Sequence, residues 1–488
     1  MLDRPARTPT ERQRGRDRTA QAGESARLGW SGRRWEPGEG VVGTKASGLV
    51  VVEEPSDRPS AATMGARLVG GDALDVARTL ADEGLGGKVD LVYVDPPFGS
   101  QTSYTHEARL DGPADGRVVR TRAYDDRWDG SLAAYLDMLA PRLDALAHLL
   151  APGATLWVHV DWRASYLVRV LLDEILGRDA FVNEIVWRRA PNLGRQAASH
   201  QFGRTLDTLV IYARPGGPAG PRLVPPTRLE AIEPGAVRID GEGRPFTTAP
   251  RGDYTDLSIA RLEKEGRVHR TATGKVYIKY FLVKDAAGEH WCRERRVDSL
   301  WTDVPPLRHA RPGERTGFPT QKPRALLDRV VACASPPGGL VVDVFAGSGT
   351  TGESAHALGR RFVLGDASPL ALATARARLL RAGVPLTVQS CAALSEEAGS
   401  ARVHVRVERE GDGATVTLEE PHEPLAWAID AARDESMPFR RAWHSERAPG
   451  TKPTPVLRVA KLARVGGPLG IRVWFDDGLV AHRTVEVP

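Results

Sequence analysis

Apolar and polar residues alternate in the pattern of an α/β fold from about residue 65 onward. The run Val89–Val94 is almost entirely apolar and has the length of a buried strand. In residues 132–150, leucines recur at steps of three and four, which predicts an amphipathic helix. A strand at 155–160 and a helix at 163–176 follow. Such alternation is typical of a doubly wound sheet, largely parallel and covered on both faces.

A long stretch then breaks this alternation. Residues 191–315 are rich in Arg, Pro, Gly and Thr and contain only short strand patterns, at 208–212 and 275–283. This composition predicts an inserted domain. The α/β pattern returns in residues 316–390, where the apolar strand 340–344 leads into a glycine-rich turn.

The two ends of the chain differ from the α/β part. Residues 391–488 alternate as strands, and an Asp-Asp-Gly turn at 476–478 predicts a hairpin, so we expect a small β-rich domain. Residues 1–60 are rich in Arg, Gly, Pro, Ser and Glu and show little periodicity. They are expected to form a mostly disordered basic tail.

Composition narrows the class of protein. Of the 488 residues 41% are hydrophobic, which suits two or three globular domains. No apolar run approaches the roughly 18 residues of a transmembrane helix, and the amino-terminal end lacks the apolar core of a secretory signal. Cys292, Cys333 and Cys391 lie too far apart for a CxxC metal site. We therefore expect a cytoplasmic protein without a metal centre.

Positive charge is concentrated in two segments. Residues 1–34 hold nine arginines and four acidic residues, a net of +5, which equals the net charge of the whole chain. Residues 187–228 hold seven arginines and the single acid Asp207, a local net of +6. Arginine suits contacts with phosphates and guanine, so this second segment is compatible with a DNA-binding surface or with a solvated loop.

The first motif that carries chemistry is the glycine-rich turn Phe345-Ala346-Gly347-Ser348-Gly349-Thr350-Thr351-Gly352, between a strand and a helix. Glycines let the backbone pass close to a ligand, and a helix N-terminus offers free N–H groups. Asp366, nineteen residues after Gly347, lies where a carboxylate can bind ribose hydroxyls. Taken alone, the motif fits a dinucleotide and S-adenosylmethionine equally well, and a turn without a ligand is the remaining alternative.

The second motif is Asp95-Pro96-Pro97-Phe98, directly after the strand Val89–Val94. Proline has no N–H to donate, so the carbonyls near it remain available as acceptors. Asp95 and the Pro96 carbonyl can accept from an exocyclic amino group while Phe98 stacks on the ring that carries it. The alternative is a proline-rich end of a strand, but the presence of both motifs in one sheet argues against it.

Together, the two motifs resemble those of amino-group DNA methyltransferases that use S-adenosylmethionine, in the permuted class in which Asp-Pro-Pro-aromatic precedes Phe-x-Gly-x-Gly. The resemblance spans residues 65–385. The layout of the motifs is most similar to that of modification subunits of restriction–modification systems and their stand-alone relatives. Further matching segments are Gly71-Asp72, Pro141-Arg142-Leu143, residues 182–187 and the Pro-Thr-Gln-Lys-Pro segment within residues 318–323. Phe98 departs from the family's common Tyr, losing the hydroxyl but keeping the stacking face.

The resemblance implies a Rossmann-like, permuted methyltransferase fold with an inserted DNA-recognition region. The implied divisions are a disordered tail (1–60), a catalytic half (61–190), an inserted target-recognition region (191–315), a cofactor-binding half (316–390) and a β-rich domain (391–488). The implied catalytic residues are Asp95, Pro96, Pro97 and Phe98. The implied cofactor-binding residues are Phe345, Ala346, Gly347, Ser348, Gly349, Thr350, Asp366, Thr320, Gln321, Lys322 and Asp72, the last of which could equally be a helix cap. The implied DNA-binding residues are Arg188, Arg189, Arg195 and Arg204.

The implied reaction transfers a methyl group from S-adenosyl-L-methionine to N6 of adenine in double-stranded DNA, because family members acting on cytosine N4 more often carry Ser at the position of Asp95. Cytosine N4 is the first alternative. A catalytically silent DNA-binding subunit and an NAD-dependent oxidoreductase are alternatives of other classes. A cognate restriction endonuclease, another subunit or a second copy of the chain are compatible partners.

Overall fold

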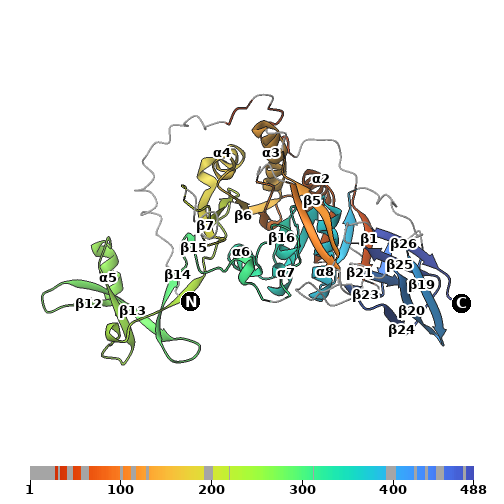
Figure 1. Ribbon diagram of the computed structural model, residues 1–488. Coiled ribbons are helices and arrows are strands. Elements are labelled where there is room, and N and C mark those ends of the chain that lie inside the picture. Colours follow the sequence, from red (N-terminus) through yellow and green to blue (C-terminus); the bar gives the residue numbers. More distant parts are fainter. Residues whose placement is uncertain are drawn as a thin grey trace.

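A computed structural model defines the fold (Figure 1). It describes residues 28–30, 33–40, 48–55, 65–98, 103–110, 117–127, 131–191, 200, 202–218, 220–311, 313–391, 403–421, 426–434, 438–446, 456–475 and 480–488.

An eleven-stranded mixed sheet forms the centre of the molecule, in the order β15-β7-β8-β6-β3-β16-β17-β2-β18-β1-β22. The six neighbouring strands from β6 to β18 are all parallel, which confirms the expected doubly wound, largely parallel sheet. The bounds are β1 (Val50–Pro55), β2 (Ala66–Gly70), β3 (Val89–Val94), β6 (Leu150–Val160), β7 (Phe181–Arg188), β8 (Leu206–Ala213), β15 (Leu300–Trp301), β16 (Leu340–Asp343), β17 (Arg361–Asp366), β18 (Thr387–Ser390) and β22 (Phe439–Arg441).

The order of strands reverses between β3 and β16, at the middle of this sheet. These two strands are neighbours in space while lying far apart in the sequence, with Val341 beside Leu91 and Val342 beside Val92. The chain winds away from this point in both directions, toward β6 on one side and toward β17 on the other. In open α/β sheets such a reversal opens a crevice at the carboxyl ends of the strands, where ligands bind.

Helices cover both faces of the sheet. One face packs against α2 (Ala73–Leu80), α3 (Leu132–Leu149) and α4 (Ser165–Leu176), and the other against α6 (Arg324–Ala334), α7 (Thr350–Ala357) and α8 (Pro369–Arg381). Within β3, Val92 and Val94 belong to the first core and Leu91 and Tyr93 to the second. Burial on both faces explains why this strand is a continuous apolar run instead of an alternating one.

Side-chain caps define where two of these helices begin. The Ser131 hydroxyl accepts a hydrogen bond from Ala134 N (3.3 Å) at the start of α3. Ser368 accepts from Ala371 N (3.4 Å) at the start of α8, and Pro369 occupies the first helical position. Serine at the cap and proline just inside the helix are both favoured at helix N-termini.

The predicted bounds of the inserted region, residues 191–315, are wrong at both ends. Strand β8 pairs antiparallel with β6 and β7, and β15 pairs parallel with β7, so both belong to the central sheet. The residues between these strands contain a separate small sheet with one helix, here called the inserted module (residues 227–296). Its elements are β9 (Thr227–Ala231), β10 (Arg238–Ile239), β11 (Pro245–Pro250), α5 (Asp256–Lys264), β12 (Val268–Arg270), β13 (Val276–Lys284) and β14 (Trp291–Arg296).

The prediction of a disordered tail through residue 60 is wrong for the segments that the structure describes. Trp35 is buried, and Arg33 forms an ion pair with Glu174 of α4 (2.7 Å). Asp144 of α3 accepts hydrogen bonds from the backbone N–H groups of Gly38 (2.8 Å) and Gly40 (2.9 Å). These contacts join residues far apart in sequence, which composition alone does not reveal.

Strand β1 extends this correction, because it carries the buried carboxylate Glu53 into the sheet. Glu53 is 1% exposed and pairs with Arg376 of α8 (2.8 Å) and with Arg441 of β22. Burial opposes ionisation of Glu53, but the two guanidinium groups outweigh it and lower its pKa to about 2. The ion pairs of Glu53 thus help to hold β1 in the central sheet.

The carboxyl-terminal residues form a β-rich region of two small sheets, as their alternation predicts. One has the order β19-β20-β24 and the other β23-β21-β25-β26. Strands β25 and β26 pair antiparallel as expected of a hairpin, although the turn at 476–479 lies outside the described residues. The bounds are β19 (His404–Glu410), β20 (Gly413–Glu420), β21 (Ala426–Asp430), β23 (Trp443–Glu446), β24 (Val459–Leu462), β25 (Leu469–Trp474) and β26 (Val480–Val485).

Between β3 and α3, strands β4 (Ser103–Leu110) and β5 (Arg117–Asp125) pair antiparallel as a two-stranded ribbon. Among the helices described, none combines the length and the apolar character needed to cross a membrane.

Candidate active site

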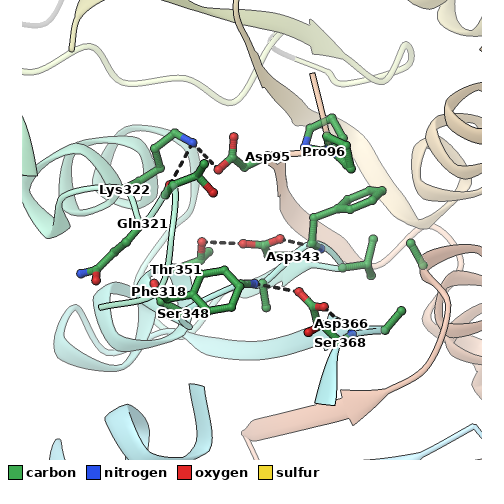
Figure 2. A pocket seen from close by; sticks show the side chains of 18 of the residues that line it. Asp95, Pro96, Phe318, Gln321, Lys322, Asp343, Ser348, Thr351, Asp366 and Ser368 are labelled. Atoms are coloured by element: carbon green, nitrogen blue, oxygen red, sulfur yellow. Dashed lines mark hydrogen bonds and ion pairs between the residues drawn. The ribbon is translucent and has the colours of Figure 1, made fainter. Parts of the chain in front are cut away.

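A cavity of about 380 Å³ lies at the carboxyl ends of β3, β16 and β17, where the order of strands reverses. Both sequence motifs line it, although they lie far apart in the chain. Figure 2 shows Asp95 and Lys322 on one side of the cavity and Asp343 and Asp366 on the other. The predicted site residues that line the cavity are Asp72, Asp95, Pro96, Pro97, Phe98, Thr320, Gln321, Lys322, Phe345, Ala346, Gly347, Ser348, Thr350 and Asp366.

The glycine-rich turn takes a conformation that requires glycine. Gly349 has φ +77° and is the residue before the first turn of α7. A Cβ at Gly349 would lie 2.9 Å from the Cβ of Ala375, so a side chain is excluded by contact as well as by backbone strain. Gly347 has φ +50°, and a Cβ there would lie 3.3 Å from the Phe318 ring. The turn therefore packs closely between α8 and Phe318 at the cavity wall.

Asp366 binds the backbone of this turn from the end of β17. Its carboxylate accepts hydrogen bonds from Gly347 N (2.9 Å) and Ser368 N (2.8 Å). Burial raises the pKa of Asp366 to about 6, and the backbone N–H groups limit the rise. Asp366 lines the cavity, and its hydrogen bonds also fix the shape of the glycine-rich turn.

Asp343, which sequence reasoning did not assign to the site, has a similar role one strand away. It is 2% exposed and accepts hydrogen bonds from Thr351 Oγ1 (2.6 Å) and Phe345 N (3.0 Å). Burial raises the pKa of Asp343 to about 7, and the nearby Asp95 and Asp366 contribute to the rise. Its position as the last residue of a buried strand, directly before the turn, is the signal that could have identified it.

On the opposite side of the cavity, Asp95 forms an ion pair with Lys322 through Oδ2. Its other oxygen, Oδ1, is buried and has no hydrogen-bond partner among the described residues. A buried acceptor without a donor is costly, on the order of 1–3 kcal/mol, so it marks a position where a ligand donor would be favourable. The ion pair also brings Lys322 to the Asp95 side of the cavity, and its expected contact with the cofactor's amino-acid end stays a prediction.

Phe98 has both Lys322 and a buried histidine as neighbours. The Lys322 ammonium is 5.2 Å from the centre of the Phe98 ring, and the His159 ring lies nearly parallel to Phe98 at 6.2 Å between centroids, with 19° between the planes. These contacts restrict the orientation of the ring that the sequence predicts to stack on a base.

His159 is fully buried and bonded on both ring nitrogens. Tyr93 Oη is 2.9 Å from Nδ1, and Asp207 Oδ2 is 3.2 Å from Nε2. Burial raises the pKa of Tyr93 well above its usual value, so its hydroxyl stays protonated beside Nδ1. Sequence reasoning missed this group, since a single histidine in an apolar strand gives no distinctive signal.

The Pro-Thr-Gln-Lys-Pro segment lines the cavity, and the Gln321 side chain is hydrogen-bonded within its own loop. Its side-chain oxygen accepts from Thr316 N (2.8 Å), and its nitrogen donates to Glu314 O (2.7 Å). In Figure 2 the Gln321 side chain points away from Asp95. Gln321 therefore holds its own loop, while Thr320 takes the rare φ of +60° between it and Pro319.

Asp72 combines the two alternatives that the sequence left open. Its side chain caps α2 by accepting from Leu74 N (2.9 Å), and it also forms an ion pair with Arg142. It lines the cavity at the same time. The cap is thus established, and a contact with a ligand remains compatible with it.

Five of the seven arginines of residues 187–228 separate into two groups, and Arg228 lies in β9 of the inserted module. Arg188, Arg189 and Arg204 lie at the carboxyl edge of the sheet, the edge of the cavity, and Arg189 pairs with Asp207 (2.7 Å). Arg214 instead donates to the carbonyls of residues 148 and 150, and Arg222 pairs with Asp90 (3.1 Å), so both have structural roles elsewhere. Arg195 lies outside the described residues.

A crevice at the point of strand reversal, with a glycine-rich turn on one side and an acidic residue beside prolines on the other, defines a ligand-binding α/β protein. Among the described residues, no group of three or more His, Cys, Asp or Glu is placed to hold a metal ion. The sequence profile of the DNA methylase family matches residues 89–376, which is more than half of the chain. The chain belongs to this family of N6- and N4-amino DNA methyltransferases.

Two relatives are similar over most of this region. The Type II methyltransferase M.EcaI of Enterobacter cloacae is 25% identical over 329 residues, which cover 62% of this chain and 67% of the relative. The Mod subunit of the Type III restriction-modification enzyme StyLTI, from Salmonella typhimurium, is 25% identical over 331 residues, which cover 59% of this chain. The match spans about half, 49%, of the length of that Mod subunit.

Among solved structures, the chain is similar to TTHA0409, a putative DNA modification methylase of Thermus thermophilus. The two are 18% identical with a TM-score of 0.36, over 67% of this chain and 99% of that one. The family assignment confirms the predicted class of protein and its cofactor, S-adenosyl-L-methionine. The cavity agrees with it, since about 380 Å³ lies within the roughly 300–1,000 Å³ of small-molecule sites, and Asp95 Oδ1 and Asp366 provide acceptors for polar ligand groups.

Proposed function

We propose that this protein methylates N6 of adenine in double-stranded DNA, with S-adenosyl-L-methionine as the methyl donor, and that it serves as the modification component of a restriction–modification system. The observation that carries the proposal is Asp95, whose buried Oδ1 has no donor among the described residues and lies beside Pro96 and Phe98. An exocyclic amino group supplies the missing donor. The choice of adenine over cytosine is supported by the Asp at position 95, by resemblance.

The residues on the Asp95 side would bind and orient the target base after it leaves the duplex. Phe98 would stack on the base, with His159 and Lys322 maintaining its orientation. Asp95 Oδ1 and the Pro96 carbonyl would accept hydrogen bonds from the amino group. Because the lone pair of that nitrogen is delocalised into the ring, these bonds would favour a more tetrahedral nitrogen and stabilise the positive charge developing on it.

The residues of the glycine-rich side would bind the cofactor. Phe345 to Thr350 would line its pocket, and Asp366 would accept hydrogen bonds from its ribose hydroxyls. When bound, S-adenosyl-L-methionine supplies an activated methyl group on a sulfonium centre. The protein's task is then mainly alignment of two bound molecules, for which a rigid turn and a fixed aromatic ring are suited.

Lys322 would act as a positioning residue for Asp95. By pairing with Oδ2 it orients the carboxylate and leaves Oδ1 for the base. His159 would act in the same way for Phe98. Neither residue needs to touch the reacting atoms.

The test is methyl transfer from labelled S-adenosylmethionine to duplex DNA by the full chain, followed by nucleoside analysis. We expect label in N6-methyladenine, and we expect Asp95→Ala to abolish it while calorimetry still detects cofactor binding. Asp179→Ala, at an exposed carboxylate outside the cavity, is the matched control and should retain activity. Label in N4-methylcytosine would overturn the choice of base, and normal methylation by Asp95→Ala would overturn the mechanism.

A further inference from the structure

The ring of His159 is held by neighbours from several strands. Tyr93 of β3 (6.3 Å between centroids, 84° between planes) and Trp187 of β7 (5.8 Å, 88°) contact it edge to face, and Phe98 lies nearly parallel to it. Asp207 of β8, which is paired in register with Trp187, supplies the hydrogen-bond partner of His159 Nε2 at 3.2 Å. A change at Asp207 would therefore reach Phe98 through a single intervening ring.

Asp207 is a buried carboxylate that remains ionised. Its side chain is 3% exposed. Burial opposes ionisation, but the hydrogen bond with His159 and the charges of Lys322 and Arg189 outweigh it and hold the pKa of Asp207 below its usual value. An ionised carboxylate can only accept hydrogen bonds, so its bond with Nε2 requires a proton on that nitrogen. The charge of Asp207 thus determines how the His159 ring is bonded.

Arg189 provides an ion-pair partner for this carboxylate. Its Nε lies 2.7 Å from Asp207 Oδ1, but the pair lacks the alignment of a hydrogen bond, and Oδ1 accepts none from the described residues. The guanidinium also donates from Nη2 to the carbonyl of Arg204 (3.3 Å), and the backbone N–H of Arg189 donates to Thr205 O (3.0 Å). The Arg189 guanidinium is therefore engaged by groups of the protein itself.

Loss of Arg189 would alter the carboxylate that it neutralises. A buried carboxylate without its cation is costly, and such a group tends to take up a proton instead. A protonated Asp207 could donate to His159 Nε2, which would require a different protonation of the ring. The support of Phe98 would then change, although neither Arg189 nor Asp207 lines the cavity.

We propose that Asp207 and Arg189 are positioning residues for methyl transfer, which together hold His159 against Phe98. The inference rests on the proposed function, which assigns Phe98 to the target base. It gives Arg189 a role in the reaction that is distinct from contact with DNA, the role expected from the sequence. Small displacements of groups that align two reactants lower the rate of the chemical step, so the effect belongs to the rate at saturating DNA.

The test is the rate of methyl transfer by the full chain from labelled S-adenosylmethionine to unmethylated bacteriophage DNA, with the DNA concentration varied at saturating cofactor. We expect Arg189→Gln to lower kcat roughly five- to tenfold and to leave KM for DNA within about twofold. Arg189→Lys keeps the cation and should retain most of the rate. The double variant Arg189→Gln/Asp207→Asn should be faster than Arg189→Gln, because no buried carboxylate is left without its cation and Asn keeps an acceptor for Nε2.

The matched control is Arg222→Gln, since Arg222 is likewise a half-exposed arginine that pairs with a carboxylate of the central sheet, Asp90 (3.1 Å). Its kcat should be unchanged, and thermal unfolding verifies that each variant is folded at the assay temperature. A raised KM for DNA with unchanged kcat in Arg189→Gln would make Arg189 a DNA contact and overturn the proposal. A double variant no faster than Arg189→Gln would overturn it as well. All transferred label is counted, so a wrong choice of methylated base would appear in the nucleoside analysis and leave these ratios interpretable.

Discussion

The two sides of the cavity treat their buried carboxylates differently. On the glycine-rich side, Asp343 and Asp366 accept hydrogen bonds from the backbone and, for Asp343, from the Thr351 hydroxyl. On the other side, Asp95 has one oxygen paired with Lys322 and one buried oxygen without a donor among the described residues. The two carboxylates of the first side thus have donors without a ligand, whereas Asp95 has a buried oxygen that lacks a donor among the described residues.

This difference suggests how one crevice divides two tasks. A wall with satisfied polar groups maintains its shape, which suits a pocket that binds the same cofactor in every turnover. An acceptor without a donor forms its hydrogen bond only when the substrate is present. Interactions that form late in this way contribute most to catalysis.

Asp95→Asn is the most direct test of the difference between the two sides of the cavity. This change keeps the size of the side chain but removes its charge, so the rate of methyl transfer should fall on the order of 10²–10³-fold. Cofactor affinity, which the proposed function assigns to the glycine-rich side, should stay within about twofold of the original. Single-turnover kinetics and calorimetry separate the two quantities, and a parallel loss of both would contradict the division.

Glu53 offers a contrast, because it is a buried carboxylate with a full set of partners and no role at the cavity. Replacing it by Gln would leave Arg376 and Arg441 buried without their anion and should reduce the free energy of unfolding by about 3–5 kcal/mol. Denaturant titration measures this loss. Glu54→Gln, at a carboxylate that pairs with exposed Arg440, is the control and should have little effect.

The ion pairs of Glu53 also make the stability of the fold depend on pH. The pKa of Glu53 is lowered to about 2 in the folded protein, so the ion pairs stabilise the fold above the ordinary glutamate pKa. That contribution should decline as the pH falls from about 4.5 toward about 2 and should be absent in Glu53→Gln. Stability curves that run parallel for the two proteins across this range would contradict it.

His159→Leu tests the support behind Phe98. We expect a roughly tenfold lower rate of methyl transfer with cofactor affinity unchanged, because only the side of the cavity to which the proposed function assigns the base loses a contact. Fluorescence of 2-aminopurine at the target position reports whether the base still enters the pocket. His290→Leu, at an exposed histidine of the inserted module, is the control.

The smallest expected effect is on pH dependence at the glycine-rich side. Burial raises the pKa of Asp343 to about 7 and that of Asp366 to about 6. Both carboxyl groups therefore bind a proton more tightly in the folded protein than in the unfolded chain. Their contribution to stability should be complete below about pH 4 and be lost as the pH rises to about 7. Asp343→Asn should reduce this decline, measured as the midpoint of thermal unfolding against pH; a steeper decline would contradict the assignment.

Much of the fold was predictable from local patterns. The apolar run of β3 and the leucine spacing of α3 indicated their positions, and the two motifs indicated one crevice through the general property of strand ends. The order of residues 33–40 and 48–55 was not predicted, because Glu53 and Trp35 are stabilised by partners far away in the sequence. The inserted region was mispredicted because β8 resembles any short strand until its partners β6 and β7 are known.

The site divides in the same way. Asp95, Phe98, the glycine-rich turn and Asp366 were identifiable since each has a backbone setting that follows from its neighbours in sequence. The ion pair of Lys322 with Asp95, the hydrogen bonds of Gln321 within its own loop, and the His159 contacts were not, because these partners meet only in the folded chain.

The amino-acid sequence by itself determined the alternation of strands and helices, the family motifs and their order. Only the tertiary structure decided which buried carboxylates have hydrogen-bond donors among the described residues and which one has an oxygen without a donor. The physical reason is that hydrogen-bonding and ion-pairing partners of a buried group are set by the packing of distant segments, whereas the local pattern records only whether a residue is turned toward a core.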